Sequence, residues 1–207
     1  MCVFEFSNAQ YVEYGLKAGL NSANLTGDME GAKSIIEFHV GGVVEITMNH
    51  KFAFQPEILF STQGSEFESA NRMRRPRPIG GDRITVLKGR HNLEYLNIPL
   101  MLKYYVSDRF YIETGPQIGF LLSANQTAKV TIIINDVEAG STVLDREDVI
   151  DRYKAIDFGA NLGVGFYFTD NISASLRYNL GLNNISNNAG DYKVSNGVLQ
   201  LSVGYLF

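Results

Sequence analysis

Eight separate segments of this chain alternate apolar and polar residues, and this pattern constrains the fold more than any other feature. Successive side chains of a β-strand point to opposite faces, so alternation predicts strands with one apolar and one polar face. The segments cover residues 14–24, 35–48, 51–63, 96–106, 110–122, 154–168, 172–183 and 198–207. Helical spacing is not sustained over a useful length, so the sequence predicts an all-β fold.

The hairpin predicted within residues 92–122 raises the question of what covers the apolar face. On its first arm Leu102 lies on the apolar face and Lys103 on the polar one. On its second arm Ile112 and Glu113 divide in the same way. A water-soluble sheet would turn its apolar face inward, whereas a membrane barrel would turn it toward lipid. The alternation by itself leaves both arrangements open.

The lengths of the connections favour the membrane arrangement. Short turns are expected at Asn49-His50, Ser107-Asp108 and Thr169-Asp170-Asn171, and long connections at residues 25–34, 64–90, 123–153 and 184–196. Short periplasmic turns and longer extracellular loops are typical of outer-membrane barrels, whose strands need no apolar run of about 18 residues. The sequence therefore predicts an eight-stranded antiparallel up-and-down transmembrane β-barrel with short periplasmic turns and long extracellular loops.

The polar face carries few ions, and ions of opposite sign lie near the middle of the strands. They are Lys17, Glu45, Glu57, Lys103, Glu113 and Arg177. The interior of an eight-stranded barrel is only wide enough for side chains to fill, so these ions are expected to pair in the lumen. One interpretation is a structural charge network in a closed lumen. The other is a gated ion path or a proton relay.

Several stretches carry a resemblance to a known family. They are YGLKAGLNSANL, FQPEILFSTQG, YLNIPLMLKYYVSDRFYIETGPQIGFLL, DFGANLGVGFYF, SLRYNLGLNNIS and LQLSVGYLF. In this order they resemble the outer-membrane β-barrel family of Bacteroidetes, the PorT-like outer membrane protein beta-barrel domain. The resemblance implies a Gram-negative outer-membrane location and no single activity, although one branch of the family assists secretion. The terminal Tyr205 and Phe207 resemble the signal read by the barrel-insertion machinery.

Motifs for catalysis or cofactor binding are missing from the sequence. The histidines His39, His50 and His91 have no second ligand at metal spacing, and there is no nucleophile elbow or phosphate loop. His39 is expected to face the lumen, either as a hydrogen-bonded interior residue or as part of a small barrel enzyme. The single Cys2 excludes an internal disulfide, and the net charge of −4 does not indicate nucleic acid. We therefore expect no enzyme activity, no cofactor and no metal.

The long connections contain two charged stretches. Between the third and fourth segments lie Arg72, Arg74, Arg75 and Arg77 among prolines. Guanidinium groups match phosphate well, so these arginines are candidates for contact with lipopolysaccharide, and a solvated loop is the alternative. Residues 129–136 are expected to form a β extension that pairs near residues 141–144. The acidic residues Asp145, Glu147, Asp148 and Asp151 could hold calcium, but their spacing matches no known calcium-binding loop, and we interpret them as a solvated group.

The termini and the partners complete the expectations. Residues 1–10 resemble the end of an export signal with cleavage near Ala9 or Gln10, and an exported leader without order or a cloning remnant explains them equally well. Residues 11–207 are expected to form one barrel domain. We expect a monomer in outer-membrane lipid and lipopolysaccharide, acting through its loops as a structural, adhesion or secretion-accessory protein. The alternative function is transport of ions or small solutes through the lumen, or a small barrel enzyme.

Overall fold

A computed structural model describes residues 11–27, 32–73, 83–134, 137–187 and 193–207, and side chains are not described for residues 71–83. Nine strands and one short 3-10 helix make up this part of the chain. They are β1 (Tyr11–Gly27), β2 (Ile35–Asn49), β3 (Phe52–Met73), β4 (Arg83–Tyr105), β5 (Phe110–Ile134), β6 (Val137–Asp148), η1 (Ile150–Arg152), β7 (Ile156–Tyr167), β8 (Ile172–Gly181) and β9 (Val194–Leu206).

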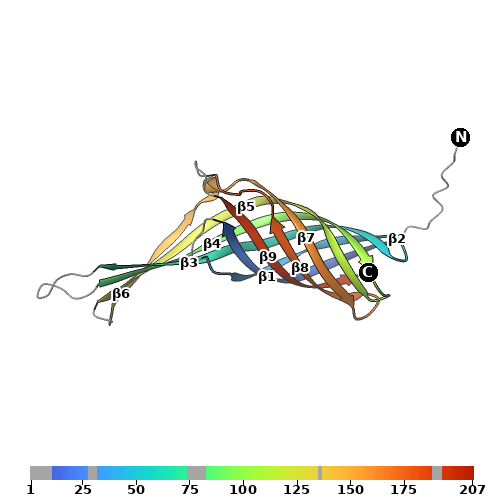
Figure 1. The fold of residues 1–207 in the computed structure, drawn as a ribbon, viewed down its shortest axis with the longest axis horizontal. Coiled ribbons are helices and arrows are strands. Elements are labelled where there is room, and N and C mark those ends of the chain that lie inside the picture. Colours follow the sequence, from blue (N-terminus) through green and yellow to red (C-terminus); the bar gives the residue numbers. More distant parts are fainter. Residues whose placement is uncertain (1–10, 28–31, 74–82, 135–136, 188–192) are drawn as a thin grey trace, which may run out of the picture.

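Eight of the strands close into a ring, which confirms the predicted barrel. The sheet runs in the order β4-β3-β2-β1-β9-β8-β7-β5, and a further pairing of β4 with β5 joins its two ends. All these pairings are antiparallel. The ninth strand, β6, pairs with β5 and lies outside the ring (Figure 1). Closure leaves the ring without free edges, which is the condition for strands to cross a lipid bilayer.

The outer surface of the ring is apolar, as the alternation predicts. Its exposed side chains include Leu16, Phe38, Ile58, Leu100, Ile112, Leu162, Leu176, Leu180 and Leu201. Aromatic rings border this surface at the short-turn end. The ring centres of Phe52 and Tyr104 lie 5.2 Å apart, and those of Tyr205 and Phe207 lie 5.3 Å apart. An apolar band flanked by aromatic girdles is the outer surface of a transmembrane barrel. Among the described residues, no helix has the length and apolar character needed to cross a membrane.

Polar side chains close the three short turns. The Asn49 Oδ1 accepts backbone hydrogen bonds from Lys51 at 2.9 Å and Phe52 at 3.1 Å. In the same way the Thr169 Oγ1 accepts from the backbone of Ile172 at 3.0 Å. In the turn between β4 and β5 the Ser107 Oγ accepts from the backbone of Phe110 at 3.2 Å. Such side-chain to backbone bonds are the reason why Asn, Ser and Thr favour turns. Tyr11, which pairs with Thr47 beside the first turn, and Phe207, which bonds to Tyr14, both lie at this short-turn end of the barrel.

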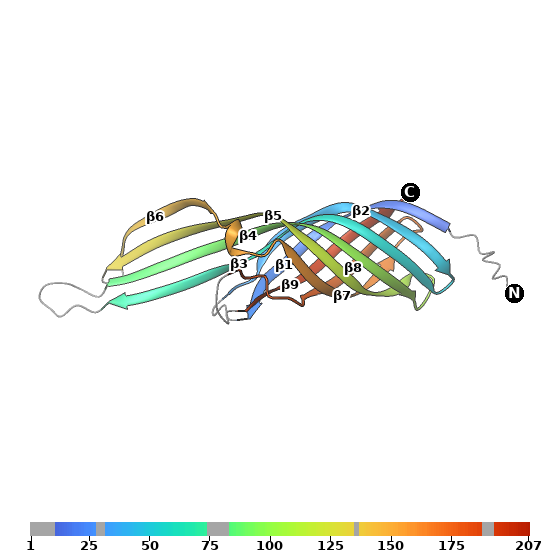
Figure 2. The ribbon, with the colours of Figure 1, turned by 90° about the horizontal axis from the view of Figure 1, so that it is seen from above.

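At the opposite end four strands extend far beyond the ring. Strands β3 and β4 stay paired up to Met73 opposite Arg83, and β5 continues alongside β4 to Ile134. We call this four-stranded part of β3, β4, β5 and β6 the projecting sheet (Figure 2). The expectation of a loop over residues 64–90 was wrong over its described part, because residues 64–73 pair in continuous register with residues 83–92 as strands. The expected β extension of residues 129–134 was confirmed, with Thr131 opposite Ser141.

Candidate functional site

The middle of the lumen is filled by a buried ionic cluster. Arg177 lies between two carboxylates and donates to both oxygens of Glu57 at 2.8 and 2.9 Å, and to both oxygens of Glu113 at 2.9 and 3.1 Å. Lys17 donates to the same Glu57 at 3.2 Å. These four side chains are between 0 and 6 % exposed. Two cations therefore balance two carboxylates, which is the condition under which buried ions are tolerated.

A second ionic group lies toward the short-turn end. Lys103 donates to Glu45 at 2.6 Å, and the hydroxyls of Tyr105 and Tyr167 also donate to this carboxylate. The Lys103 ammonium lies 4.4 Å from the ring centre of Tyr111, a cation–π contact. Together the three tyrosines form an aromatic layer across the lumen, with ring centres 5.6 to 6.4 Å apart. Gly165 makes this layer possible, because a side chain there would collide with the Tyr111 ring.

Amide and hydroxyl groups fill the part of the lumen between the ionic cluster and the end that carries the projecting sheet. The Asn21 Nδ2 donates to the backbone oxygens of Phe38 and Thr62 at 3.1 and 2.9 Å, so its Oδ1 faces His39 Nδ1 at 2.7 Å. His39 Nδ1 is therefore a donor, and Nε2 accepts from the Ser202 hydroxyl at 2.8 Å. This Ser–His–Asn arrangement has the connectivity of a hydrolase triad.

The triad-like group has no space for a substrate. Ser202 is 2 % exposed. A Cβ placed on Gly19 would lie only 2.7 Å from His39 and from Ser202, so the backbone of β1 packs directly against both residues. An acyl group could not enter without displacing a strand of the barrel. The geometry makes His39 a hydrogen-bonded interior residue.

An apolar plug closes the lumen at the end that carries the projecting sheet. Its buried members are Leu25, Leu93, Tyr95, Ala124, Val149, Ile185 and Val194. Val149 and Ile185 come from the connections that follow β6 and β8, and backbone bonds to Ala124 (3.0 Å) and Val194 (2.8 Å) hold these connections over the mouth. The cavity in the lumen beside Lys17 and Lys103 has a volume of about 10 Å³, enough for about one water molecule. Of the inward side chains described between the tyrosines and the plug, Arg177, Glu57, Asn21 and His39 are each at most 1 % exposed.

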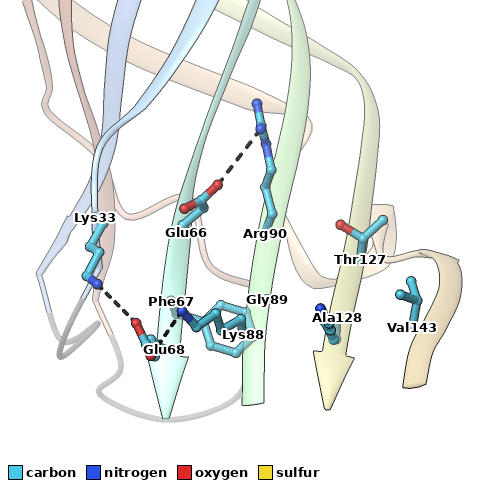
Figure 3. A pocket seen from close by; sticks show the side chains of 11 residues that line it. Lys33, Glu66, Phe67, Glu68, Lys88, Gly89, Arg90, Thr127, Ala128 and Val143 are labelled. Carbon is cyan, nitrogen blue, oxygen red and sulfur yellow. Dashed lines mark hydrogen bonds and ion pairs between the residues drawn. The ribbon is translucent and has the colours of Figure 1, made fainter. Parts of the chain in front are cut away.

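The projecting sheet carries paired charges on one face (Figure 3). The Glu68 carboxylate forms ion pairs with the ammonium groups of Lys33 at 3.1 Å and Lys88 at 3.3 Å. The Arg90 guanidinium lies 3.9 Å from the Glu66 carboxylate and also pairs with Glu37. These side chains border a shallow groove of about 360 Å³. Lys33 and Lys88 hold the pKa of Glu68 below its usual value. Each acid in this row has a cation beside it, so the face is close to neutral.

The remaining predicted site residues have separate locations. Arg72 pairs with Ile84 near the end of the projecting sheet, and Arg74, Arg75 and Arg77 lie outside the described residues. Tyr205 and Phe207 belong to the aromatic girdle, and the backbone of Phe207 donates to Tyr14 at 2.8 Å.

The acidic residues after β5 do not gather. Glu147 pairs with Arg152 at 2.9 Å, and Asp148 accepts from the backbone of Ile150 at 3.0 Å. The described residues contain no group of three or more potential metal ligands. These carboxylates therefore serve local turns and ion pairs in the structure.

Sequence reasoning missed the aromatic layer and the plug. Tyr105, Tyr111 and Tyr167 stand at inward positions of the alternation, so their clustering at one level could have been found by aligning the strands. Leu93 and Tyr95 are inward as well, but apolar residues at inward positions interrupt the pattern on which the strand assignment depended. Ile185 lies in a connection, where no periodicity signals burial.

A closed antiparallel ring with an apolar, aromatic-bordered exterior and an ion-paired interior defines a transmembrane β-barrel protein. The chain belongs to the family of the outer membrane protein beta-barrel domain, whose family model matches residues 6–187. It is accordingly an integral protein of the outer membrane.

Three of the solved structures to which this chain is similar are bacterial proteins, matched over almost their whole length. Neisserial surface protein A has 11 % identity and a TM-score of 0.47, covering 94 % of this chain and 97 % of its own. The attachment invasion locus protein Ail of Yersinia pestis has 12 % identity and a TM-score of 0.44, with coverages of 94 % and 98 %. OprG of Pseudomonas aeruginosa has 11 % identity and a TM-score of 0.42, with coverages of 96 % and 97 %. No curated protein matches the sequence significantly.

Proposed function

We propose that this protein is a non-enzymatic outer-membrane barrel that acts at the cell surface through its projecting sheet. The observation that supports this most is the contrast between a filled lumen and an exposed extension. Ion pairs, amides, tyrosines and an apolar plug occupy the described lumen, and the triad-like Ser202 has no substrate space. The projecting sheet, by contrast, offers exposed strands beyond the membrane-spanning ring.

The proposal also covers the membrane partners and the oligomeric state of the protein. Lipid covers the apolar band, the terminal Tyr205 and Phe207 are read by the insertion machinery, and the protein works as a monomer. Arg72 on β3, together with Arg74, Arg75 and Arg77 that follow it in the sequence, is proposed to contact lipopolysaccharide phosphates. Surface recognition in adhesion is the role we favour. The secretion-accessory role implied by the PorT-like resemblance would use the same sheet.

Conductance in planar lipid bilayers tests the closed lumen. The refolded full chain should insert, as shown by a heat-modifiable gel shift, and should give no stable single-channel steps. Ions cannot pass a filled interior, so no steps are expected from a closed lumen. Ion transport through the lumen would instead produce such steps. Regular conductance steps from heat-modifiable protein would therefore overturn the surface-only proposal.

Adhesion and secretion are separated in cells that lack the protein. Loss of attachment to a surface with normal export of secreted proteins would support the adhesion role. Retention of secreted proteins in the periplasm would instead support the secretion-accessory role. Full recovery of attachment by a chain without the projecting sheet would contradict the use of this sheet in adhesion, and full recovery of export would contradict its use in secretion.

A further inference from the structure

The outer edge of β6 is one of the two outer edges of the projecting sheet. In the described part of the chain β6 has one neighbour, β5, so its second edge carries unpaired backbone groups. All 12 residues of β6 are exposed. On the opposite edge, formed by β3, Lys33 bridges to Glu66 and its side chain pairs with Glu68, so that edge is covered at this point. A long edge without such protection is a template for another strand.

The middle of this edge is uncharged and regular. Residues 140–144 read Gly-Ser-Thr-Val-Leu and pair without irregularity with residues 128–132 of β5. Val143 is 69 % exposed and Leu144 48 % exposed. β-Branched and apolar residues on an open edge favour strand addition, in which main-chain hydrogen bonds supply affinity and alternate side chains supply selectivity.

Acidic residues flank this uncharged stretch. Glu138 precedes it, and Asp145, Glu147 and Asp148 follow it, against one cation, Arg146. Arg146 lies 3.9 Å from Glu94, and Glu147 pairs with Arg152. No ion pair forms at Glu138 or Asp145 among the described residues. The edge therefore presents negative charge on both sides of an apolar centre.

We propose that β6 is a docking edge for an extended polypeptide segment of another protein, with small or apolar residues at its centre and basic residues at its ends. The segment adds as a strand beside residues 140–144, and its basic ends face Glu138 and Asp145. This inference rests on the proposed surface function and names its binding mode. A second copy of the chain fits less well, because it would bring the same excess of acid to the contact.

A labelled peptide tests the proposal on the full chain in lipid nanodiscs. The probe is a short peptide of alternating threonine and valine residues between lysine pairs, and fluorescence anisotropy measures its binding. We expect binding at low ionic strength that salt weakens. N-methylation of alternate central amides should reduce affinity at least ~10-fold when it falls on the docking edge of the peptide, because it removes main-chain donors and keeps charge and side chains.

Matched variants locate the site. The double variant Glu138→Gln and Asp145→Asn should weaken peptide binding roughly fivefold at low ionic strength. Asp108→Asn, in a turn at the opposite end of the barrel, should leave it unchanged. Equal binding of peptides N-methylated on either edge, or equal loss in the Asp108 variant, would overturn strand addition at β6. A stable dimer that excludes the peptide would also overturn it, since the edge would then belong to a second copy. Failure here with a non-conducting barrel would leave the surface function standing, whereas conductance would overturn that function itself.

Discussion

At the scale of single residues, Arg177 determines whether the lumen can hold its charges. Its guanidinium, on β8, joins Glu57 on β3 across the lumen to Glu113 on β5, which lies two strands away on the same side with Gly163 of β7 between them. Planar guanidinium can serve two carboxylates at once, which an ammonium cannot do with the same geometry. The opposite charges at mid-strand were readable in the sequence. The choice of partners was not, because alternation gives the face of a residue but not its neighbours across the lumen.

Replacing Arg177 by methionine should strongly destabilise the barrel. Glu57 would keep Lys17 as its one cationic partner and the amide of Gln55, and Glu113 would lose its bidentate partner in a buried site. Loss of one member of a buried ion pair costs about 3–5 kcal/mol. Unfolding by urea in lipid vesicles measures the change. The variant Arg109→Met, in an exposed turn, is the control and should change little. Adding Glu113→Gln to Arg177→Met should recover part of the loss, and strictly additive losses would contradict the pairing.

His91 links the projecting sheet to the plug and predicts a pH dependence. Its ring lies 5.3 Å from Phe67, and its Nδ1 contacts the Tyr153 hydroxyl at 3.0 Å. Burial, and then the charge of Arg152, lower the pKa of His91 from its usual value of 6.5. The unfolded segment therefore binds a proton more readily than the folded one, so stability is full above pH 6.5 and falls as the pH drops below it.

Hydrogen exchange corrected for intrinsic rates checks this pH dependence. Amides of residues 149–153 should lose protection between pH 7.5 and 5.5, as the neutral imidazole that the folded segment favours becomes protonated. His91→Gln should remove most of this dependence. His50→Gln, in an exposed turn, should leave it intact. If the protection of these amides rose as the pH fell, folding would raise the pKa of His91 instead of lowering it, and the prediction would be wrong.

At the scale of elements, the sequence was most informative inside the membrane. Within the ring each strand has lipid on one side and packed polar groups on the other, so period-two alternation is strict from Leu16 on β1 to Leu201 on β9. Above the membrane this contrast disappears, since both faces of the projecting sheet meet water. The strands over residues 65–71 and 84–90 therefore lacked the pattern that would have marked them.

Arginine scanning should reveal where the lipid ends along these elements. Leu176 on β8 is 45 % exposed and Leu144 on β6 is 48 % exposed, so the two sites differ mainly in their surroundings. Leu176→Arg should cost roughly 2–4 kcal/mol, because lipid cannot solvate the charge near the bilayer midplane. Leu144→Arg, outside the ring, should cost far less. Folding titrations in vesicles compare the two, and equal costs would contradict the membrane position of the ring.

At the scale of the whole molecule, the fold was predictable and the surface site was not. Turn lengths, strand number and face assignment all follow from local rules, and together they specify the barrel. The plug depends on Val149 and Ile185 folding back from connections, which is a long-range arrangement without a sequence period. The sequence predicted that residues 129–134 pair with residues near 141–144, which is the pairing of β5 with β6. The open second edge of β6 was not predicted, because it depends on β5 continuing beyond its last pair with β7, which only the pairing register shows.

The barrel and the projecting sheet should be separable. In the shortened chain, two-residue Asn-Gly turns replace residues 67–89 and 127–146. The flanking pairs Glu66 with Arg90 and Gln126 with Glu147 already face each other in register, and Asn-Gly suits a tight hairpin. The plug and the ionic cluster remain, so the shortened chain should keep its heat-modifiable shift. Its unfolding free energy in vesicles should stay within about 1 kcal/mol of the full chain, because connection length changes closure entropy only slowly. Peptide binding at β6 should disappear. A shortened chain that fails to insert would instead make the projecting sheet part of the folding core, and its exposed strands would no longer be free to serve recognition alone.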